Sequence, residues 1–335
     1  MEPLLLIPLV ISFFVSFLII PKWINKAKKI GLVWKDMNKY DKKEVSGSGG
    51  IGVILGFILG VLIFIQIKTF WFESSENVVE ILALTTSILI LAGIGMFDDL
   101  LGWRQGGLSK KNRLILCLFA AIPLMVINAG YGKVGLPFIG VINLKLIYPL
   151  IIIPLGIIGA STTFNFLAGF NGLEAGQGIL ILSALSFVAY ITGNSWISII
   201  GLCMIFALLG FLIFNKFPAR VFPGDILTYP VGGMIAIMAI IGNFEKIAVF
   251  FFIPYILETF LKLRGKLKMQ SFGKPNKDGS LELPYKKIYG LEHLSILILS
   301  KFKKKVYEKD VVYLIHSFQI LIILIGFLIF KNYLF

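Results

Sequence analysis

The stretch that decides the fold is Ile81-Leu-Ala-Leu-Thr-Thr-Ser-Ile-Leu-Ile-Leu-Ala-Gly-Ile-Gly-Met-Phe97, which Asp98 and Asp99 follow at once. The uncharged run approaches the roughly 20 residues that a helix needs to cross a bilayer. Carboxylates are costly at a membrane boundary, and a cation or a proton pathway is the usual reason for them. Other apolar runs end in Asn165, Asn171 and Asp225. We therefore expect one polar site built on several membrane spans.

Composition indicates an integral membrane protein. The chain has 335 residues, of which 57% are hydrophobic and 15% charged, with a mean hydropathy of +0.89. A soluble protein is roughly 45–50% apolar and about 25% charged. The first run, Leu4 to Ile20, lacks a basic start and a cleavage site, so it is predicted to be a span rather than a signal peptide. Cys117 and Cys203 lie inside apolar runs and predict neither a disulfide framework nor a zinc site.

The apolar runs predict an all-α integral membrane fold with ten transmembrane helices, forming a single polytopic membrane domain over residues 1–335. The predicted spans are 4–20, 50–67, 78–97, 114–128, 147–164, 177–191, 196–214, 230–243, 246–261 and 312–330. An even number of spans places both termini on one side of the membrane.

The distribution of charge predicts the orientation. Alternate loops, at 21–49, 98–113, 165–176, 215–229 and 262–311, hold 27 of the 32 Lys and Arg residues. Positive charge favours the cytoplasmic side, so these loops are predicted to be cytoplasmic. The same rule accounts for the net charge of +14, and no nucleic-acid partner is expected. In the last loop, the turn-like stretch 273–280 predicts a small hairpin, and an amphipathic interfacial helix is expected at about 287–300.

Three carboxylates lie near the ends of predicted spans, in loops that are predicted to be cytoplasmic. Asp98 and Asp99 close one run, and Asp225 follows Phe222-Pro-Gly. Mg²⁺ is commonly held by one or two carboxylates together with substrate phosphates. The alternatives are acids paired with nearby basic residues at a helix end, and a simple turn at Asp225. Against the first, carboxylates at a helix C-terminus oppose the helix dipole.

The segment from Asn165 to Gln177 places amides and a carboxylate among small and apolar residues. The amides of Asn165 and Asn171 can coordinate a cation or pair with the edge of a base, and Glu174 is a further substrate-binding candidate. The alternative is helix packing. Arg113 opens a span, and its guanidinium suits phosphate recognition; the alternative is a basic side chain that extends to the membrane surface.

Taken together, these residues favour a lipid-directed phosphoryl-transfer enzyme. The rival is a cytoplasm-facing transporter of ions or lipid phosphate. A transporter would account for the spans and the carboxylates, but not for the asparagine-rich segment or for Phe222-Pro-Gly-Asp225. Transporters also more often hold charge near the middle of the bilayer.

Three motifs resemble those of the polyprenyl-phosphate N-acetylhexosamine-1-phosphate transferases. They are Gly95-Met-Phe-Asp-Asp-Leu-Leu101, Asn165-Phe-Leu-Ala-Gly-Phe-Asn-Gly-Leu-Glu-Ala-Gly-Gln177 and Phe222-Pro-Gly-Asp225. The second motif and the stretch 277–285 look most like the branch that uses UDP-GlcNAc and dolichyl phosphate. The resemblance implies ten spans and transfer of GlcNAc-1-phosphate from UDP-GlcNAc to a polyprenyl (dolichyl) phosphate. The same chemistry with another UDP-N-acetylhexosamine stays an alternative.

The resemblance also implies catalytic roles. Asn165 and Asp225 match positions that hold Mg²⁺, for which Mn²⁺ is an alternative, with the donor pyrophosphate. Asp98 and Asp99 match an acidic pair near the lipid phosphate, and Arg113 matches a position that contacts phosphate. Asp98 matches the position proposed as a base. A phosphate monoester has a second pKa near 6 and is already dianionic at pH 7, so a base is hardly required.

For substrate binding, the resemblance implies that Phe222 stacks on uracil, that Asn171 reads the uracil edge and that Gly172 belongs to the same pocket. Relatives carry a histidine- and arginine-rich cluster in the last loop. The comparable stretch here has no histidine, and Arg264 and Lys268 are the candidates to replace it.

The expected partners are UDP-GlcNAc, polyprenyl or dolichyl phosphate and membrane lipids, and a homodimer stays open. The resemblance implies an archaeal plasma membrane or a eukaryotic endoplasmic reticulum membrane, with the active site facing the cytoplasm.

Overall fold

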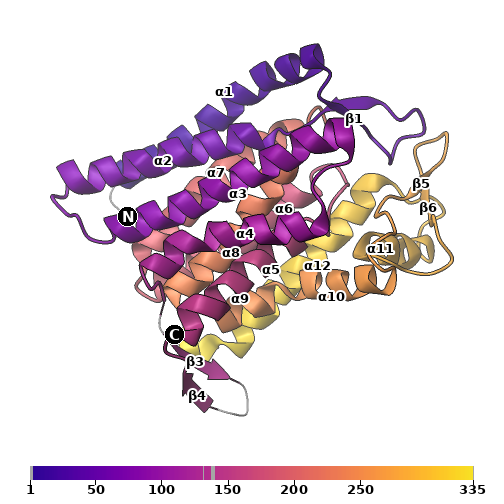
Figure 1. Cartoon of the computed structure of the whole chain (residues 1–335). Helices are drawn as coiled ribbons and strands as arrows, with labels where there is room; N and C mark the ends of the chain where they lie inside the picture. The colour runs from indigo at the N-terminus through magenta and orange to yellow at the C-terminus, as the bar shows by residue number, and fades with distance from the viewer. Residues whose placement is uncertain (1–2, 131, 137–139, 335) are drawn as a thin grey trace.

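A computed structural model describes residues 3–130, 132–136 and 140–334, and these residues are mostly helical (Figure 1). The helices run α1 (Leu6–Ile30), α2 (Gly50–Phe70), α3 (Val78–Gln105), α4 (Lys110–Val126), α5 (Ile153–Phe164), α6 (Leu173–Ile191), α7 (Ser195–Asn215), α8 (Asp225–Gly242), α9 (Glu245–Phe251), α10 (Ile253–Arg264), α11 (Leu291–Ser300), α12 (Glu308–Ile329) and α13 (Lys331–Leu334). Two short helices, η1 (Pro3–Leu5) and η2 (Tyr148–Ile152), precede α1 and α5.

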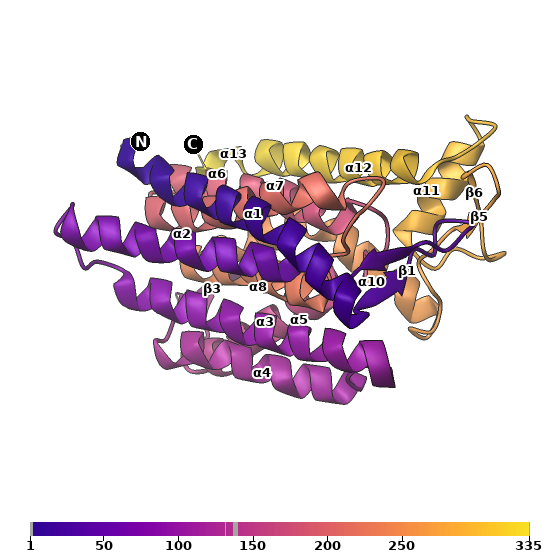
Figure 2. The ribbon, with the colours of Figure 1, turned by 90° about the horizontal axis from the view of Figure 1, so that it is seen from above.

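The long helices lie side by side in one bundle (Figure 2). Within the described residues, seven helical segments are long and apolar enough to cross a bilayer. They are Pro3–Ile30, Gly50–Phe70, Val78–Gly102, Leu173–Ile191, Ser195–Asn215, Asp225–Gly242 and Glu308–Ile329. The chain is therefore an all-α integral membrane protein, as its composition predicts.

The other three predicted spans coincide with shorter helices. The span 114–128 falls on α4, and the span 147–164 falls on η2 and α5. The span 246–261 is divided at Phe252 into α9 and α10. Pro254 lies in the first turn of α10, where its missing N–H costs nothing, whereas a continuous helix would lose a hydrogen bond there. The ten-span topology stays a prediction.

Three antiparallel hairpins are present in the described part of the chain. They pair β1 (Val33–Lys35) with β2 (Glu44–Ser46), β3 (Lys133–Leu136) with β4 (Gly140–Asn143), and β5 (Lys274–Pro275) with β6 (Leu281–Glu282). The first and third hairpins gather with α11 at one end of the bundle, away from both termini (Figures 1 and 2). The hairpin and helix expected in the last loop are therefore present, with the helix beginning at Leu291.

Helix ends differ from the predicted loop boundaries. Asp98 and Asp99 lie inside α3, which continues to Gln105 and ends at Gly106 in the left-handed region (φ 85°). Arg113 lies in the first turn of α4. Hydropathy marks where a chain becomes polar, but a helix can continue into water because its backbone hydrogen bonds are internal. Gly106 tolerates positive φ and gives the actual stop.

The central helix α8 positions the site. Almost every residue of α8 is buried, because α8 packs mainly against α3 and α5 and also contacts α2, α6, α7 and α9. Its first residue is Asp225. One end of the most enclosed helix thus carries a carboxylate that the sequence predicts to be functional.

Candidate functional site

A cavity of about 700 Å³ opens at the hairpin end of the bundle. This volume lies within the roughly 300–1,000 Å³ range of small-molecule sites. Of the residues predicted from the sequence, those that line the cavity are Asp98, Asp99, Arg113, Asn165, Glu174, Phe222 and Asp225. The structure thus brings together candidates from α3, α4, α6, α8 and the loops before α6 and α8.

Asp98 is engaged on both carboxylate oxygens. Its Oδ1 accepts hydrogen bonds from the Leu108 N–H at 2.7 Å and from Arg113 Nη2 at 3.2 Å. Its Oδ2 accepts one from the Tyr229 hydroxyl at 3.0 Å and lies 2.6 Å from Arg113 Nε in an ion pair. Asp98 is 2% exposed. Both oxygens of Asp98 are thus occupied, and two of their contacts hold the Arg113 guanidinium.

Asp99 faces α8 instead. Its Oδ1 accepts a hydrogen bond from the Asp225 N–H at 2.8 Å, and its Oδ2 accepts one from the Ile226 N–H at 3.4 Å. A carboxylate at a helix N-terminus accepts hydrogen bonds from free N–H donors and is stabilised by the positive end of the helix dipole. Gly224 permits this approach: its φ is 73°, and a Cβ there would lie 2.2 Å from Asp99 Oδ2. Asp99 therefore fixes the start of α8 and, with it, Asp225.

Asn165 and Asp225 meet at the ends of α5 and α8. The Asn165 side chain donates from Nδ2 to Asp225 Oδ1 at 2.8 Å. The side-chain oxygen of Asn165 and the carboxylate of Asp225 are hard oxygen donors of the kind that Mg²⁺ prefers. No cluster of three or more His, Cys, Asp or Glu side chains suited to a metal occurs in the described residues. The donor set fits a cation that takes its remaining ligands from a substrate and from water.

The glycine-rich stretch Ser46–Gly50 lies against the loop Phe222–Asp225. The Phe222 N–H donates to the Ser46 carbonyl at 2.7 Å, and the N–H groups of Gly49 and Gly50 donate to the carbonyls of Phe222 and Pro223, each at 2.9 Å. The start of α2 thereby anchors the loop that carries Phe222 toward the cavity.

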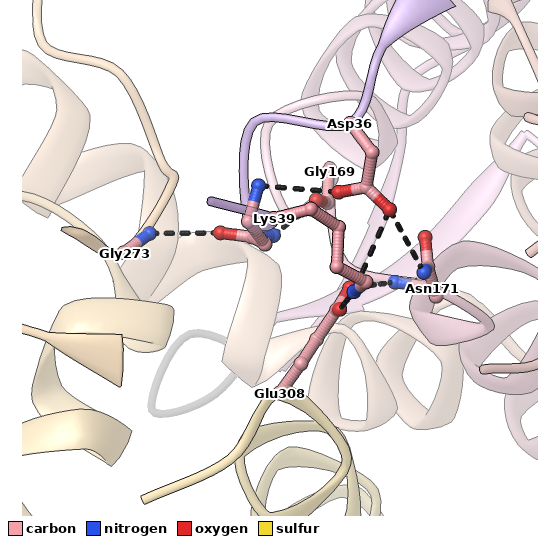
Figure 3. Close-up of polar contacts among 7 residues, drawn as sticks. Asp36, Lys39, Gly169, Asn171, Gly273 and Glu308 are labelled. Carbon is pink, nitrogen blue, oxygen red and sulfur yellow. Dashed lines mark hydrogen bonds and ion pairs between the residues drawn. The ribbon is translucent and has the colours of Figure 1, made fainter. Parts of the chain in front are cut away.

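The segment from Gly169 to Glu174 contributes some residues to the cavity lining and buries others behind that lining. Glu174 lines the cavity and accepts a hydrogen bond from the Gly169 N–H at 2.8 Å. Asn171 is buried behind the wall, where its side chain donates to Asp36 Oδ2 at 3.2 Å (Figure 3). Gly172 caps α6 with a φ of 86° and is not among the lining residues. The uracil-reading role of Asn171 and Gly172 stays a prediction.

Arg264 and Lys268, the sugar-phosphate candidates, are exposed and do not line the cavity. The buried lysine of this region is Lys262, which lies 3.3 Å from Glu258 and contacts the Ser271 hydroxyl. The residue of the last loop that reaches the cavity is Phe272.

Several lining or supporting residues were missed by sequence reasoning. Asp36 and Phe272 line the cavity, and Tyr229 contacts Asp98. Asp36 and Asn38 carry a local signal, because Asp-x-Asn after a strand is typical of a turn closed by an Asp side chain. Tyr229 and Phe272 carry none, since only the fold brings them to the site.

A second cavity, of about 510 Å³, forms an apolar groove along α5. Its walls come from α5, α8, α9 and α10 and include Leu155, Gly159, Ala239, Val249 and Phe260. The groove follows α5 up to Thr163, two residues before Asn165. The apolar groove thus runs toward the polar cavity that Asn165 lines.

Comparison with known proteins decides the family. Residues 81–243 match the profile of Glycosyl transferase family 4. A Saccharolobus solfataricus protein, provisionally named UDP-N-acetylglucosamine–dolichyl-phosphate N-acetylglucosaminephosphotransferase, is 39% identical over 90% of both chains. The chain belongs to glycosyltransferase family 4. A Sulfolobus acidocaldarius relative with the same provisional name is 35% identical over 93% of this chain and 92% of its own.

A third family 4 relative comes from Dictyostelium discoideum and is named UDP-N-acetylglucosamine–dolichyl-phosphate N-acetylglucosaminephosphotransferase. It is 28% identical over 72% of this chain and 67% of its own. The resemblance inferred from the three motifs is therefore confirmed. The family 4 match runs from α3 to the end of α8, so it contains Asp98, Arg113, Asn165 and Asp225 but neither the first hairpin nor the last loop.

Proposed function

We propose that this protein transfers GlcNAc-1-phosphate from UDP-GlcNAc to a polyprenyl (dolichyl) phosphate, giving polyprenyl-diphospho-GlcNAc and UMP. This is the first membrane step of glycan assembly. The observation that carries the proposal is the 39% identity, over 90% of both chains, to a relative named for this reaction. The acids, amides and arginine around the cavity supply the chemistry that the reaction needs.

In the proposed reaction, an oxygen of the lipid phosphate attacks the sugar-linked phosphorus of UDP-GlcNAc. A new P–O–P bond forms, the old one breaks, and UMP leaves with the electron pair. The lipid phosphate is largely dianionic at pH 7, so no proton has to be removed. Positioning and neutralisation of charge then supply most of the rate. Arg113, held in place by Asp98, is suited to bind phosphate oxygens.

Mg²⁺ is the proposed cofactor, and Mn²⁺ is an alternative. Asn165 and Asp225 would hold it, because their side-chain oxygens match the ligands of a hard cation. When bound, the cation would neutralise charge on the donor pyrophosphate. Asp99 contributes by keeping the Asp225 backbone at the start of α8.

The lipid acceptor is proposed to lie in the apolar groove along α5. Its walls are almost entirely aliphatic and aromatic side chains, which suit an isoprenoid chain. Since the groove reaches Thr163, a lipid phosphate at that end would lie near Asn165. Donor and acceptor would then reach one cation site from two separate cavities.

The site is proposed to face the cytoplasm, where 27 of the 32 basic residues are predicted to lie. Relatives from archaea and from Dictyostelium suit an archaeal plasma membrane or a eukaryotic endoplasmic reticulum membrane.

The test is release of radiolabelled UMP from UDP-GlcNAc by purified protein in nanodiscs, with the lipid product measured in parallel. Both products should appear in equal amounts, and only with polyprenyl phosphate and a divalent cation present. A panel of other UDP-N-acetylhexosamines identifies the preferred donor. Uptake of lipid phosphate into vesicles without any UMP would refute the proposal and favour a transporter.

A further inference from the structure

Residues 36–39, between β1 and β2, form a buried turn that we call the clasp. Asp36 is 4% exposed and Asn38 is 1% exposed, although both lie in a connection between strands. Asp36 Oδ1 accepts a hydrogen bond from the Asn38 N–H at 3.1 Å and closes the turn. Polar side chains are seldom buried this fully unless their hydrogen bonds are made to specific partners.

Asn38 uses both ends of its side-chain amide. Its Nδ2 donates to the Gly169 carbonyl at 2.8 Å, and its Oδ1 accepts from the Gly273 N–H at 3.0 Å. Gly169 precedes α6, and Gly273 precedes β5 in the last loop. One side chain therefore ties together backbone segments that are more than a hundred residues apart.

Lys39 and Asp36, the other polar residues of the clasp, contact Glu308 and the segment before α6. Lys39 forms an ion pair with Glu308 and lies 3.5 Å from Asp36 Oδ2 (Figure 3). Glu308, the first residue of α12, accepts a hydrogen bond from the Asn171 N–H at 2.7 Å through its second oxygen. Asp36 Oδ2 accepts from the Asn171 side chain. Both the backbone and the side chain of Asn171 are thus fixed by buried carboxylates.

The segments that the clasp joins form one wall of the cavity. Gly169, Phe170 and Phe272 line the cavity, as does Asp36. Gly169 has a φ of 103°, and a Cβ there would lie 2.7 Å from the Phe272 ring. The Phe272 ring therefore packs directly on the Gly169 backbone. The two hydrogen bonds of Asn38, to the Gly169 carbonyl and the Gly273 N–H, join the two segments beside this contact.

We propose that Asn38 is a positioning residue that sets the spacing between Gly169 and Phe272, and thereby the fit of the cavity wall to the donor nucleotide sugar. This inference rests on the proposed function for the identity of the donor. The acceptor groove is lined by α5, α8, α9 and α10 and shares no lining residue with the clasp. A change at Asn38 should therefore weaken donor binding and leave acceptor binding alone.

The test compares steady-state kinetics of Asn38→Asp and the unmodified enzyme. The substitution keeps an oxygen acceptor for the Gly273 N–H but places an oxygen against the Gly169 carbonyl. Loss of a buried hydrogen bond is expected to raise the KM for UDP-GlcNAc about tenfold. The kcat and the KM for polyprenyl phosphate should each stay within about threefold. Asn276→Asp is the matched control: Asn276 bonds Ser280 and Glu282 within the β5–β6 hairpin and does not line the cavity. It should leave all three constants unchanged.

A thermal-shift titration with UMP gives a second measurement that needs no turnover. Asn38→Asp should show a weaker UMP-dependent stabilisation than the unmodified protein. If Asn38→Asp fails to fold, Glu308→Gln, which weakens the Lys39 ion pair, should raise the donor KM in the same selective way. Equal changes in both KM values, a change in kcat alone, or unchanged kinetics and UMP binding would each overturn the proposal. Absence of turnover in the unmodified enzyme would contradict the proposed function, while UMP binding would still report on the clasp.

Discussion

Asp98 and Arg113 form a two-point ion pair, with Nε 2.6 Å from Oδ2 and Nη2 3.2 Å from Oδ1. Asp99, which follows Asp98 in the sequence, points to the start of α8 and accepts a hydrogen bond from the Asp225 N–H. Adjacent acids thus serve different partners: one orients a cationic side chain, and the other fixes a carboxylate at the end of a helix. The predictions below separate these roles.

Asp98→Asn should reduce kcat about a hundredfold, because Arg113 loses the charge that orients it. The acidic limb of the pH–rate profile should stay, since it follows ionisation of the lipid phosphate near pH 6. The measurement is UMP release across pH 5–9. Arg113→Ala should be similarly impaired, and the double variant should be little worse than either single variant. Disappearance of the acidic limb in Asp98→Asn would instead identify Asp98 as a base.

Asp99→Ala should lower both stability and activity. The Asp225 and Ile226 N–H groups lose their acceptor, a loss that typically costs about 0.5–2 kcal/mol at a helix N-terminus. We expect the Tm in detergent to fall by a few degrees, measured by intrinsic fluorescence. Asp99→Asn, which keeps one acceptor oxygen, should recover part of the Tm. An unchanged Tm in Asp99→Ala would show that the cap contributes nothing to stability.

Chelation of divalent cations should stop UMP release, and Mg²⁺ or Mn²⁺ should restore it. Asp225→Ala and Asn165→Ala should abolish the restored activity, because the proposed cation site loses an oxygen donor. Asn276→Ala, outside the cavity, is the control and should respond to Mg²⁺ like the unmodified enzyme. Full Mg²⁺-dependent transfer by either site variant would reject the metal assignment.

Gly159→Leu should obstruct the apolar groove selectively. A Cβ at Gly159 meets no atom within 4 Å, so the new side chain can enter the groove without displacing backbone. The KM for long-chain polyprenyl phosphate should rise about tenfold, and the KM for UDP-GlcNAc should not change. Replacing glycine inside a helix also favours the helix by roughly 0.5–1 kcal/mol, so the Tm should not fall. An unchanged acceptor KM would exclude the groove as the lipid site.

Glu292→Gln should flatten the dependence of stability on pH. Burial, together with the charge of Glu258, raises the pKa of the Glu292 carboxyl well above its ordinary value. The folded protein therefore keeps a proton that the unfolded chain releases above about pH 4.5. The stability from this group is present at lower pH and is lost as pH rises toward the raised pKa. Tm should thus fall less between pH 5 and 9 in the variant than in the unmodified protein. Glu282→Gln, at an exposed carboxylate, is the control.

The sequence could predict the helices and seven of the residues that line the cavity, because apolar length and residue chemistry are local. The run from Ile81 to Phe97 became most of α3, and Asp98, Asn165 and Asp225 all reached one cavity. The local pattern Phe222-Pro-Gly-Asp225 also indicated a functional loop, which the structure anchors through backbone hydrogen bonds to residues 46–50.

What the sequence could not predict depends on contacts between distant segments. The hydropathy of residues 246–261 predicted one span, whereas in the structure Phe252 separates α9 from α10. Hydropathy averaged over many residues does not reveal a helix break of one residue. Nothing local relates Asn38 to Gly273, or Tyr229 to Asp98. Arg264 and Lys268 were chosen for their charge, whereas the last loop meets the cavity through the aromatic ring of Phe272.

The contact of Glu308 with Asn171 has a consequence for biogenesis. Glu308 is supplied by the last long helix, and the segments it joins were synthesised far earlier. Ribosomal synthesis proceeds from the N-terminus, so Lys39 and Asn171 are made before their shared carboxylate exists. A nascent or truncated chain would contain Arg113 and Asp225, but it would lack the contacts of Glu308 with Lys39 and Asn171. The cavity wall that contains Gly169 and Phe170 would then reach its final form only after the start of α12 has been made.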